Sequence, residues 1–280
     1  MLKTAHKIAL ARLASRVILV FRRMAGYGSN VTAGRHGIRW DLDLQEGIDL
    51  SIYLLGAFER RTVRAYSALI KENDIVLDIG ANMGAHTLIL AQLIGPGGKV
   101  IAFEPTTYAC GKLFRNIALN PLLATRIQVK QWMLVSSFSE PLEPAIYSSW
   151  PLAASNDIHE QHHGRLMETS GAIAKTLDVA VHELGLKRVD FVKLDVDGHE
   201  LSVIRGGFQV LREFKPRMIL ELAPYSFPDN QIFDSMVNLL WESGYVFRRL
   251  NNGVYLPKVA ASLRSMIPDG GGLNVLAEVP

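Results

Sequence analysis

Cysteine is nearly absent from this sequence: Cys110 is the single one among 280 residues. One cysteine cannot form a disulfide within the chain, so a disulfide-stabilised scaffold is excluded. The chain is 49% hydrophobic and 20% charged, which at this length is enough to bury a full core without a disulfide or a metal to hold it. The lack of cysteine also suits a reducing compartment, so we expect a cytoplasmic protein.

The sequence also lacks a strong excess of charge of either sign. Its formal net charge is +3, and its basic residues do not alternate with aromatic residues along a strand as they do in RNA-binding sheets. We therefore expect no nucleic-acid partner.

Long uninterrupted hydrophobic runs are missing as well, even in the apolar N-terminal stretch from Leu2 to Met24. Six basic residues interrupt it: Lys3, Lys7, Arg12, Arg16, Arg22 and Arg23. Each apolar run is therefore shorter than the roughly 20 residues that span a bilayer, and no small-residue cleavage site of a signal peptide follows. The pattern predicts a basic amphipathic helix. It either packs on its own domain or caps the active site, or it lies peripherally on the inner face of the membrane.

The order of predicted elements divides the chain into two parts. Residues 1–57 form an extension that contains the basic helix and a β-hairpin between Val31 and Leu44, where apolar and polar residues alternate. Residues 58–280 alternate short apolar strands with helices, which predicts an α/β domain with a mostly parallel sheet covered by helices on both faces. We expect a single strand over residues 127–135 and a single helix over residues 199–214.

A glycine-rich turn follows the first strand of this domain, in the stretch Val76-Leu77-Asp78-Ile79-Gly80-Ala81-Asn82-Met83-Gly84. Gly80 and Gly84 can let a ligand approach the backbone closely, as in dinucleotide-binding folds. Asp78 would repel the pyrophosphate of NAD, whereas it suits the ammonium and sulfonium groups of S-adenosylmethionine. Asp78, Gly80, Asn82 and Gly84 are therefore predicted to bind that cofactor.

A second candidate is Glu104, which ends the next strand and is followed by Pro105. An acid about 20 residues beyond the glycine turn can accept hydrogen bonds from both ribose hydroxyls. We predict that Glu104 and Pro105 contribute to binding the adenosine part of the cofactor.

A third group of polar residues lies at the end of a later strand, in Val192-Lys193-Leu194-Asp195-Val196-Asp197-Gly198-His199-Glu200. Ligands of open α/β sheets bind at such carboxyl ends. Asp195, His199 and Glu200 are the candidate catalytic residues. Asp195 is expected to hold the substrate hydroxyl or the methionine end of the cofactor. His199 is a candidate general base, since its ordinary pKa is near neutral. Helix capping is the structural alternative for the residues after Asp195.

No fixed spacing of metal ligands is present, so we predict no metal site. The alternative is a divalent cation held by carboxylates, which would come from Asp195, Asp197, Glu200 and Glu221. His159, His162 and His163 lack an acidic or cysteine partner at ligand spacing, which favours a solvated loop.

These motifs together resemble the FkbM family of methyltransferases. Besides the three stretches above, the resemblance includes Asn116-Ile117-Ala118-Leu119-Asn120, Thr176-Leu177-Asp178 and Ile219-Leu220-Glu221. It covers roughly residues 58–222. The sequence departs from the family pattern at Asp197, where the family usually has Glu, and at His199, where it often has another residue.

The resemblance implies a seven-stranded Rossmann-like sheet of the class I methyltransferase type. It also implies methyl transfer from S-adenosylmethionine to a hydroxyl of a sugar, polysaccharide or natural product. The irregular segment 136–175, with Tyr147 and Trp150, is a candidate lid over the acceptor; its alternative is a surface loop. The alternative functions are an NAD-dependent oxidoreductase and a non-catalytic module that binds cofactor or a membrane surface.

Overall fold

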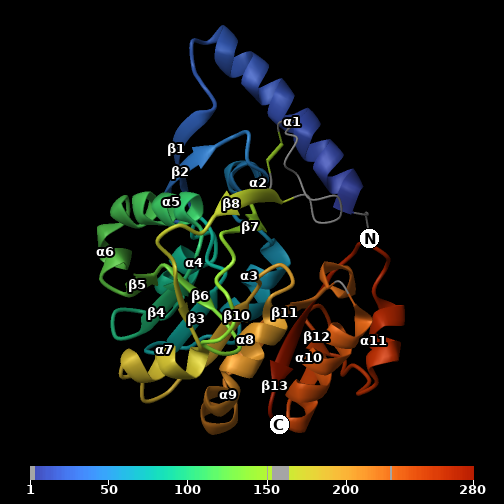
Figure 1. Cartoon of the computed structure of the whole chain (residues 1–280). Coiled ribbons are helices and arrows are strands. Elements are labelled where there is room, and N and C mark those ends of the chain that lie inside the picture. The colour runs from blue at the N-terminus through green and yellow to red at the C-terminus, as the bar shows by residue number, and fades with distance from the viewer. Residues whose placement is uncertain (1–3, 150, 153–163, 228) are drawn as a thin grey trace.

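A seven-stranded sheet forms the centre of the molecule (Figure 1). The computed structural model describes residues 4–149, 151–152, 164–227 and 229–280. In the order β12-β13-β11-β10-β3-β4-β5, the strands are Val246–Arg249, Leu273–Glu278, Arg217–Leu222, Phe191–Leu194, Ile75–Ile79, Lys99–Phe103 and Ile127–Lys130. β13 runs antiparallel to both neighbours, and the other described pairs are parallel. This order confirms the class I methyltransferase fold.

Strand order reverses between β3 and β10, because the chain adds β4 and β5 on one side and β10 and β11 on the other. Ligands of open α/β sheets bind at the carboxyl ends of the strands, at such a switch point. The sheet therefore places the predicted glycine turn, after β3, beside the predicted Asp195, after β10.

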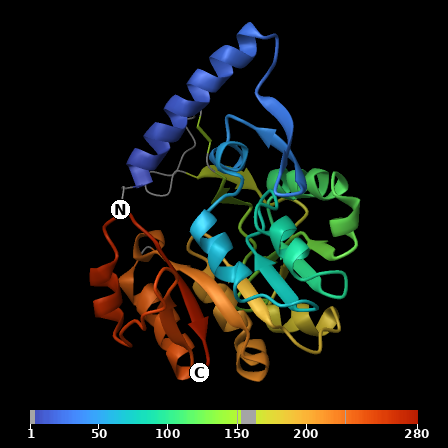
Figure 2. The ribbon, with the colours of Figure 1, turned by 180° about the vertical axis from the view of Figure 1, so that it is seen from behind.

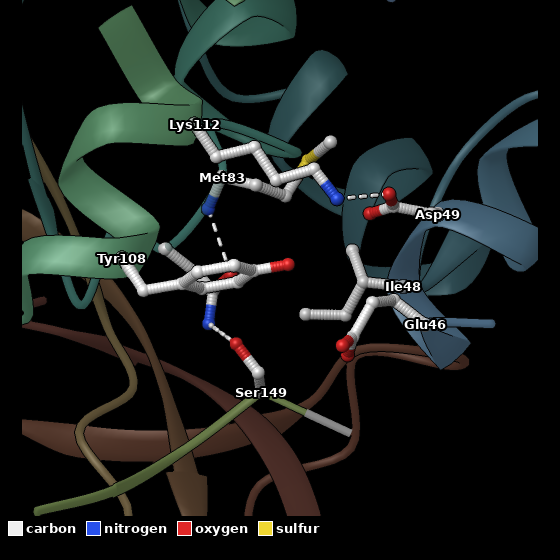
Figure 3. Close-up of a pocket in the computed structure, with 8 residues that line it drawn as sticks. Glu46, Ile48, Asp49, Met83, Tyr108, Lys112 and Ser149 are labelled. Carbon is white, nitrogen blue, oxygen red and sulfur yellow. Dashed lines mark hydrogen bonds and ion pairs between the residues drawn. The ribbon is translucent and has the colours of Figure 1, made fainter. Parts of the chain in front are cut away.

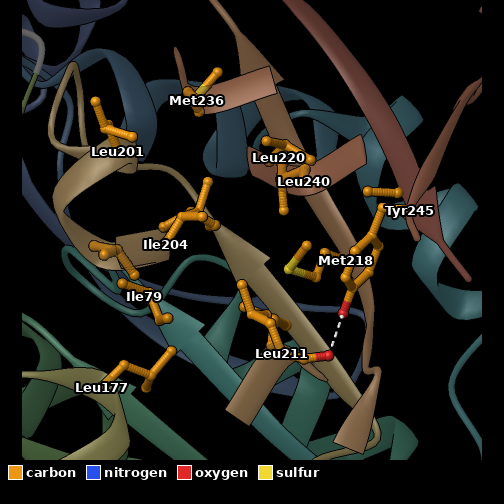
Figure 4. Close-up of a cluster of buried hydrophobic side chains, with 14 of the residues drawn as sticks. Ile79, Leu177, Leu201, Ile204, Leu211, Met218, Leu220, Met236, Leu240 and Tyr245 are labelled. Atoms are coloured by element: carbon orange, nitrogen blue, oxygen red, sulfur yellow. Dashed lines mark hydrogen bonds between the residues drawn. The ribbon is translucent and has the colours of Figure 1, made fainter. Parts of the chain in front are cut away.

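Helices cover both faces of the sheet, as predicted. On one face lie α3 (Arg60–Ser67), α4 (Thr87–Leu93) and α5 (Thr107–Ala118), followed by the short α6 (Pro121–Ala124). On the other lie α7 (Leu177–Glu183), α8 (Glu200–Gly206), α9 (Phe208–Phe214), α10 (Asn230–Glu242) and α11 (Ala260–Met266). Figure 4 shows the apolar side chains that join this second layer to the strands. Both faces are buried, which explains the nearly continuous apolar character of the strands.

The N-terminal part contains the predicted helix and hairpin: α1 (Thr4–Met24), β1 (Asn30–Arg35) and β2 (Ile38–Asp43), followed by α2 (Gly47–Leu55). One side of α1 packs on the protein, where Leu19 contacts the buried Leu44 and Leu50. None of the described helices is long and apolar enough to cross a membrane. The division of the chain at residue 57 stays a prediction.

Two predicted elements were wrong in extent. The single strand expected over residues 127–135 breaks at Gln131 into β5 and β6 (Trp132–Leu134), and β6 pairs with β9 (Ile173–Lys175) outside the main sheet. The Gln131 side chain donates to the Pro105 and Ser170 carbonyl oxygens at this break.

The single helix expected over residues 199–214 is also divided, into α8 and α9 at Gly206-Gly207. A Cβ atom on Gly206 would lie 2.1 Å from the Val135 carbonyl oxygen, and one on Gly207 would lie 2.6 Å from a Leu177 methyl group. Close packing against neighbouring segments requires both glycines, and together they interrupt the helix.

The segment expected to be irregular contains regular structure as well. Besides β9 it forms the antiparallel pair β7 (Ala145–Ser148) and β8 (Arg165–Glu168). A short 3-10 helix, Pro224–Ser226, follows β11. Helices α2 and α11 were not expected from the sequence.

Candidate cofactor-binding and active site

The glycine turn after β3 is joined by backbone hydrogen bonds to the ends of two other strands. The amides of Gly80 and Ala81 both donate to the Phe103 carbonyl oxygen of β4, at 3.0 Å. On the other side, the Asp195 amide donates to the Ile79 carbonyl oxygen at 3.1 Å. The three stretches that the sequence analysis singled out therefore meet at one edge of the sheet.

Both glycines of the turn have a backbone conformation that other residues rarely adopt, with φ values of +82° at Gly80 and +92° at Gly84. A Cβ atom on Gly80 would lie 1.8 Å from the Asp195 carbonyl oxygen, and one on Gly84 would lie 2.7 Å from a Leu113 methyl group. Contacts within the protein thus explain why both positions are glycine. Close approach of a ligand to the turn stays a prediction.

On the β4 side of the turn, Glu104 is almost fully buried and its carboxylate accepts three hydrogen bonds. Oε1 accepts from the amide and the hydroxyl of Thr106, at 2.9 and 2.5 Å, and Oε2 accepts from the Asn82 amide at 2.8 Å. Burial raises the pKa of Glu104, and these hydrogen bonds oppose that rise. A carboxylate has about four acceptor positions, so this arrangement fixes the side chain and leaves little of its capacity unused.

Asp78 lies beneath the turn and is completely buried. Its Oδ2 atom accepts a hydrogen bond from the Thr87 hydroxyl at 2.6 Å, while Oδ1 has no hydrogen-bond partner among the described residues. Burial raises the pKa of this carboxyl group. The hydrogen bond from Thr87 therefore ties the end of β3 to the start of α4, and cofactor binding by Asp78 stays a prediction.

On the β10 side, Lys193 and Asp195 project from the same face of the strand and form an ion pair of 2.8 Å. The strand register places Lys193 directly opposite Asp78. Burial opposes ionisation of Asp195, but Lys193 outweighs it and holds the pKa of Asp195 below its ordinary value. Asp195 is thus an ionised carboxylate at the switch point of the sheet.

Several further carboxyl groups surround this ion pair. We define the acidic cluster as Glu59, Asp78, Asp195, Asp197, Glu200 and Glu221. Burial, reinforced by the charge of Asp195, raises the pKa of Glu59, of Asp197 and of Glu221. These groups repel one another in a poorly solvated space, so a bound cation would relieve the repulsion.

The two other catalytic candidates have different surroundings. The His199 side chain is 28% exposed, and its Nδ1 atom lies 3.9 Å from a carboxylate oxygen of Glu143. Glu200 is buried and accepts hydrogen bonds from the amides of Val196 and Gly198, at 3.2 and 3.1 Å. Burial raises the pKa of Glu200 to about 7. Glu200 fastens the loop after β10, and catalytic roles for both residues stay predictions.

Two members of this site, Lys193 and Glu59, were not expected from the sequence. Lys193 carried a usable signal, because it is a charged residue two positions before Asp195 in an apolar strand. Glu59 carried none, since tertiary packing alone brings it to the sheet edge from the start of α3. There its Oε1 atom accepts from the Asn274 amide group at 3.3 Å, and its buried Oε2 atom has no hydrogen-bond partner among the described residues.

Comparison with known proteins identifies the family. A family profile described as the methyltransferase FkbM domain matches residues 78–247, more than half of the chain. The chain belongs to the FkbM methyltransferase family. The match includes the glycine turn, Glu104 and the β10 end, and it favours methyl transfer over the NAD-dependent alternative.

Curated relatives of this FkbM methyltransferase include three named methyltransferases. The methyltransferase sdnD of Sordaria araneosa is 25% identical over 59% of this chain and 75% of its own length. The hexuronic acid methyltransferase AglP of Haloferax volcanii is 30% identical over 53% of this chain, but the match spans only 56% of AglP. The 2-O-methyltransferase NoeI of Sinorhizobium fredii is 25% identical over 62% of this chain and 71% of NoeI.

Among solved structures, an FkbM methyltransferase from Methylobacillus flagellatus KT covers 79% of this chain and 48% of its own, with 17% identity and a TM-score of 0.47. The fold assignment given above rests on the strand order of the sheet itself.

Described residues of segment 136–175 contact both the glycine turn and the start of α8. At one end the Asn82 amide group donates to the Ser148 hydroxyl at 3.2 Å; at the other the Ser202 hydroxyl donates to Glu140 at 3.0 Å. Trp150, one of the two aromatic residues predicted for the lid, lies outside the described residues, as do His159, His162 and His163. Tyr147 is described and is partly exposed in β7. The contacts agree with a lid, which stays a prediction.

A small pocket opens next to Asn82 and Met83, between α2 and α5 (Figure 3). Its walls carry the buried ion pair between Lys112 and Asp49, the Tyr108 ring and Glu46. Burial raises the pKa of Glu46 to about 7, although Arg165 lies 3.5 Å from one of its oxygens. The N-terminal part of the chain thus contributes charged groups directly beside the glycine turn.

No three histidine, cysteine or acidic side chains within the described ranges are arranged to hold a metal ion. The absence of a metal site, and the alternative of a cation held by carboxylates, both stay predictions.

Proposed function

We propose that this FkbM methyltransferase transfers a methyl group from S-adenosylmethionine to a hydroxyl group of a sugar, either free or within a glycan or natural product. The observation that carries the proposal is the convergence of the glycine turn, Glu104 and the Lys193–Asp195 pair at one edge of the sheet. The names of AglP and NoeI, which specify a hexuronic acid and O-methylation, support a sugar acceptor.

The residues at this edge fit a cationic cofactor. S-adenosylmethionine supplies an activated methyl group on a positively charged sulfur and also carries an ammonium group. Glu104 would accept a ribose hydroxyl at its remaining acceptor position. Asp195 and the Glu59 Oε2 atom, which accepts no hydrogen bond from the described residues and lies 3.8 Å from His86 Nε2, would face the ammonium group. Asp78, whose Oδ1 atom accepts no hydrogen bond from the described residues, would ionise more readily beside a positively charged ligand and so favour its binding. A phosphate-bearing cofactor would meet the same carboxylates with repulsion.

His199 is the side chain that we propose as the general base. It is more exposed than Glu200 and, unlike Asp195, is not held in a 2.8 Å ion pair with a lysine, and a Glu143 oxygen 3.9 Å from its Nδ1 atom would stabilise the imidazolium once it forms. The imidazole would take up the hydroxyl proton of the acceptor as its oxygen receives the methyl group that S-adenosylmethionine supplies. Segment 136–175 would exclude water and align the acceptor, a contribution that can supply much of the rate.

The cofactor is tested by calorimetric titration of the chain with S-adenosylhomocysteine and, separately, with NAD. We expect micromolar binding of the first ligand alone, weakened by Asp78→Ala and by Glu104→Ala but not by Glu72→Ala at an exposed position. Binding of NAD, or of neither ligand, would refute the proposed cofactor.

The reaction is tested by following transfer of a labelled methyl group to a panel of uronic acids, neutral sugars and hydroxylated aromatic compounds. We expect transfer to a sugar, and we expect His199→Gln to lower kcat while leaving S-adenosylhomocysteine affinity within twofold. Cofactor binding without transfer to any acceptor would favour the non-catalytic module. Unchanged kcat in the variant would remove His199 as the base.

A further inference from the structure

Where the structure describes it, helix α1 contacts the rest of the protein through one of its sides. Ser15 and Leu19 are buried, and the Ser15 hydroxyl donates to the Leu44 carbonyl oxygen at 2.7 Å. Near the helix end, the Arg22 guanidinium donates to the carbonyl oxygens of Gly28 and Asn30. Figures 1 and 2 show the helix running along the outside of the molecule. Packing on the protein thus accounts for one side of the helix and leaves the other uncovered.

The opposite side of α1 is apolar although it faces solvent. We call this side the outer stripe; its residues are Leu10, Leu13, Val17, Val20, Phe21 and Met24, each between 48% and 79% exposed. They recur at intervals of three and four residues, which places them on one side of a helix. A helix that only packs on its own domain normally turns polar residues outward, so the outer stripe calls for a further partner.

The charges on α1 are all of one sign. The helix contains no acidic residue, and the exposed Arg16 and Arg23 lie seven positions apart on the flank of the outer stripe next to Val20. A partner that covers the stripe therefore has to offer an apolar interior and a negatively charged margin. A second copy of α1 would instead place arginines near one another with no acid to pair them.

We infer that the outer stripe of α1 docks this methyltransferase on an anionic lipid surface. Phe21, Val17 and the neighbouring apolar side chains would enter the acyl boundary, while Arg16 and Arg23 contact phosphate-bearing headgroups. The helix would lie in the plane of the membrane surface, since it is not long and apolar enough to cross a bilayer. The inference is independent of the identity of the methyl acceptor.

Co-sedimentation of the full chain with lipid vesicles tests this inference. We expect the protein to bind vesicles of roughly 30% phosphatidylglycerol in phosphatidylcholine, to bind pure phosphatidylcholine at least about tenfold more weakly, and to be released at high salt. Val17→Ser combined with Phe21→Ser, and Arg16→Gln combined with Arg23→Gln, should each lower the partition coefficient about tenfold or more. Leu122→Ser, at an apolar residue of α6 that is more exposed than Val17 or Phe21, is the control.

Circular dichroism and S-adenosylhomocysteine titration of the same variants show whether they fold, since neither pair touches the cofactor site. Folded variants that lose vesicle binding support the inference. Absence of binding by the unmodified chain, or equal loss in Leu122→Ser, overturns it. A dimer in light scattering that the Val17/Phe21 variant converts to a monomer, without any vesicle binding, would assign the stripe to a second copy instead.

Discussion

The two sides of the glycine turn carry acidic residues that are stabilised in different ways. On the β4 side, Glu104 stands alone and three donors from the protein hold its two oxygens. On the β10 side, several carboxyl groups share the charge of Lys193, and one oxygen each of Glu59 and Asp78 accepts no hydrogen bond from the described residues. Hydrogen bonds fix the first side, whereas the second is held by a balance of charges.

The difference suggests what each side contributes to cofactor binding. A carboxylate whose oxygens are already oriented loses little entropy when it accepts a ligand hydroxyl. The β4 side is therefore preorganised to bind a ligand of matching geometry. The β10 side carries excess negative charge in a buried setting and gains most from a ligand that brings positive charge. Substitutions on the β10 side should therefore weaken binding of the charged part of the ligand, whereas those on the β4 side should weaken binding of its adenosine part.

Removal of Lys193 should give the largest effect. Lys193→Met leaves Asp195 and Asp78 without their buried counter-charge, and breaking such a pair costs about 3 kcal/mol of unfolding free energy. Urea unfolding at pH 8 measures the loss, which should shrink at pH 5 as the carboxyl groups take up protons. Lys175→Met, which breaks the more exposed pair with Glu183, is the control and should cost less than about 1 kcal/mol. Equal losses in both variants would contradict a charge-balanced site.

Most of the residues on both sides of the turn could be predicted from the sequence, because they belong to short motifs at the ends of parallel strands. Such ends meet at one edge, so the motifs alone were enough to place Asp78, Glu104 and Asp195 together. Glu59 could not be placed in this way, since it reaches the site from the start of α3 through contacts with distant strands. The breaks at Gln131 and at Gly206-Gly207 were missed for the same reason: packing partners far along the chain decide them.

Neutralising Asp195 should come next in size. Asp195→Asn keeps the shape of the side chain but removes its charge, so we expect S-adenosylhomocysteine to bind about thirtyfold more weakly, or ~2 kcal/mol. 5′-Methylthioadenosine, which lacks the amino-acid part, should bind the variant as it binds the unmodified chain. Asp190→Asn, at the opposite end of β10, is the calorimetric control. Equal weakening of both ligands would mean that Asp195 does not face the ammonium group.

The corresponding change on the β4 side should have a smaller and less selective effect. Glu104→Gln keeps one accepting oxygen but places an amide group where the protein donates, so we expect roughly tenfold weaker binding of adenosine-containing ligands. S-adenosylhomocysteine and 5′-methylthioadenosine should be affected alike, in contrast to Asp195→Asn. If only the amino-acid-bearing ligand were weakened in this variant, the assignment of ribose to Glu104 would fail.

Glu46 lies outside the acidic cluster and should give the smallest effect, seen as a pH dependence of stability. Burial raises its pKa to about 7 from 4.5, so between these values the folded chain holds a proton that the unfolded chain has released. Stability therefore falls as pH rises through this window. Glu46→Gln should remove this loss, so it should raise stability more at pH 8 than at pH 5, by at least about 1 kcal/mol.

Part of the slope should persist in this variant, because burial also raises the pKa of Glu200 to about 7, and the sign of its contribution is the same. Urea unfolding at several pH values separates the two contributions, with Glu72→Gln at an exposed position as the control. Parallel stability curves for Glu46→Gln and the unmodified chain would assign the whole slope to the acidic cluster on the β10 side. If stability of Glu46→Gln did not change with pH, the whole slope would be assigned to Glu46. Glu200 would then be ionised in the folded chain, with its charge compensated by Lys193.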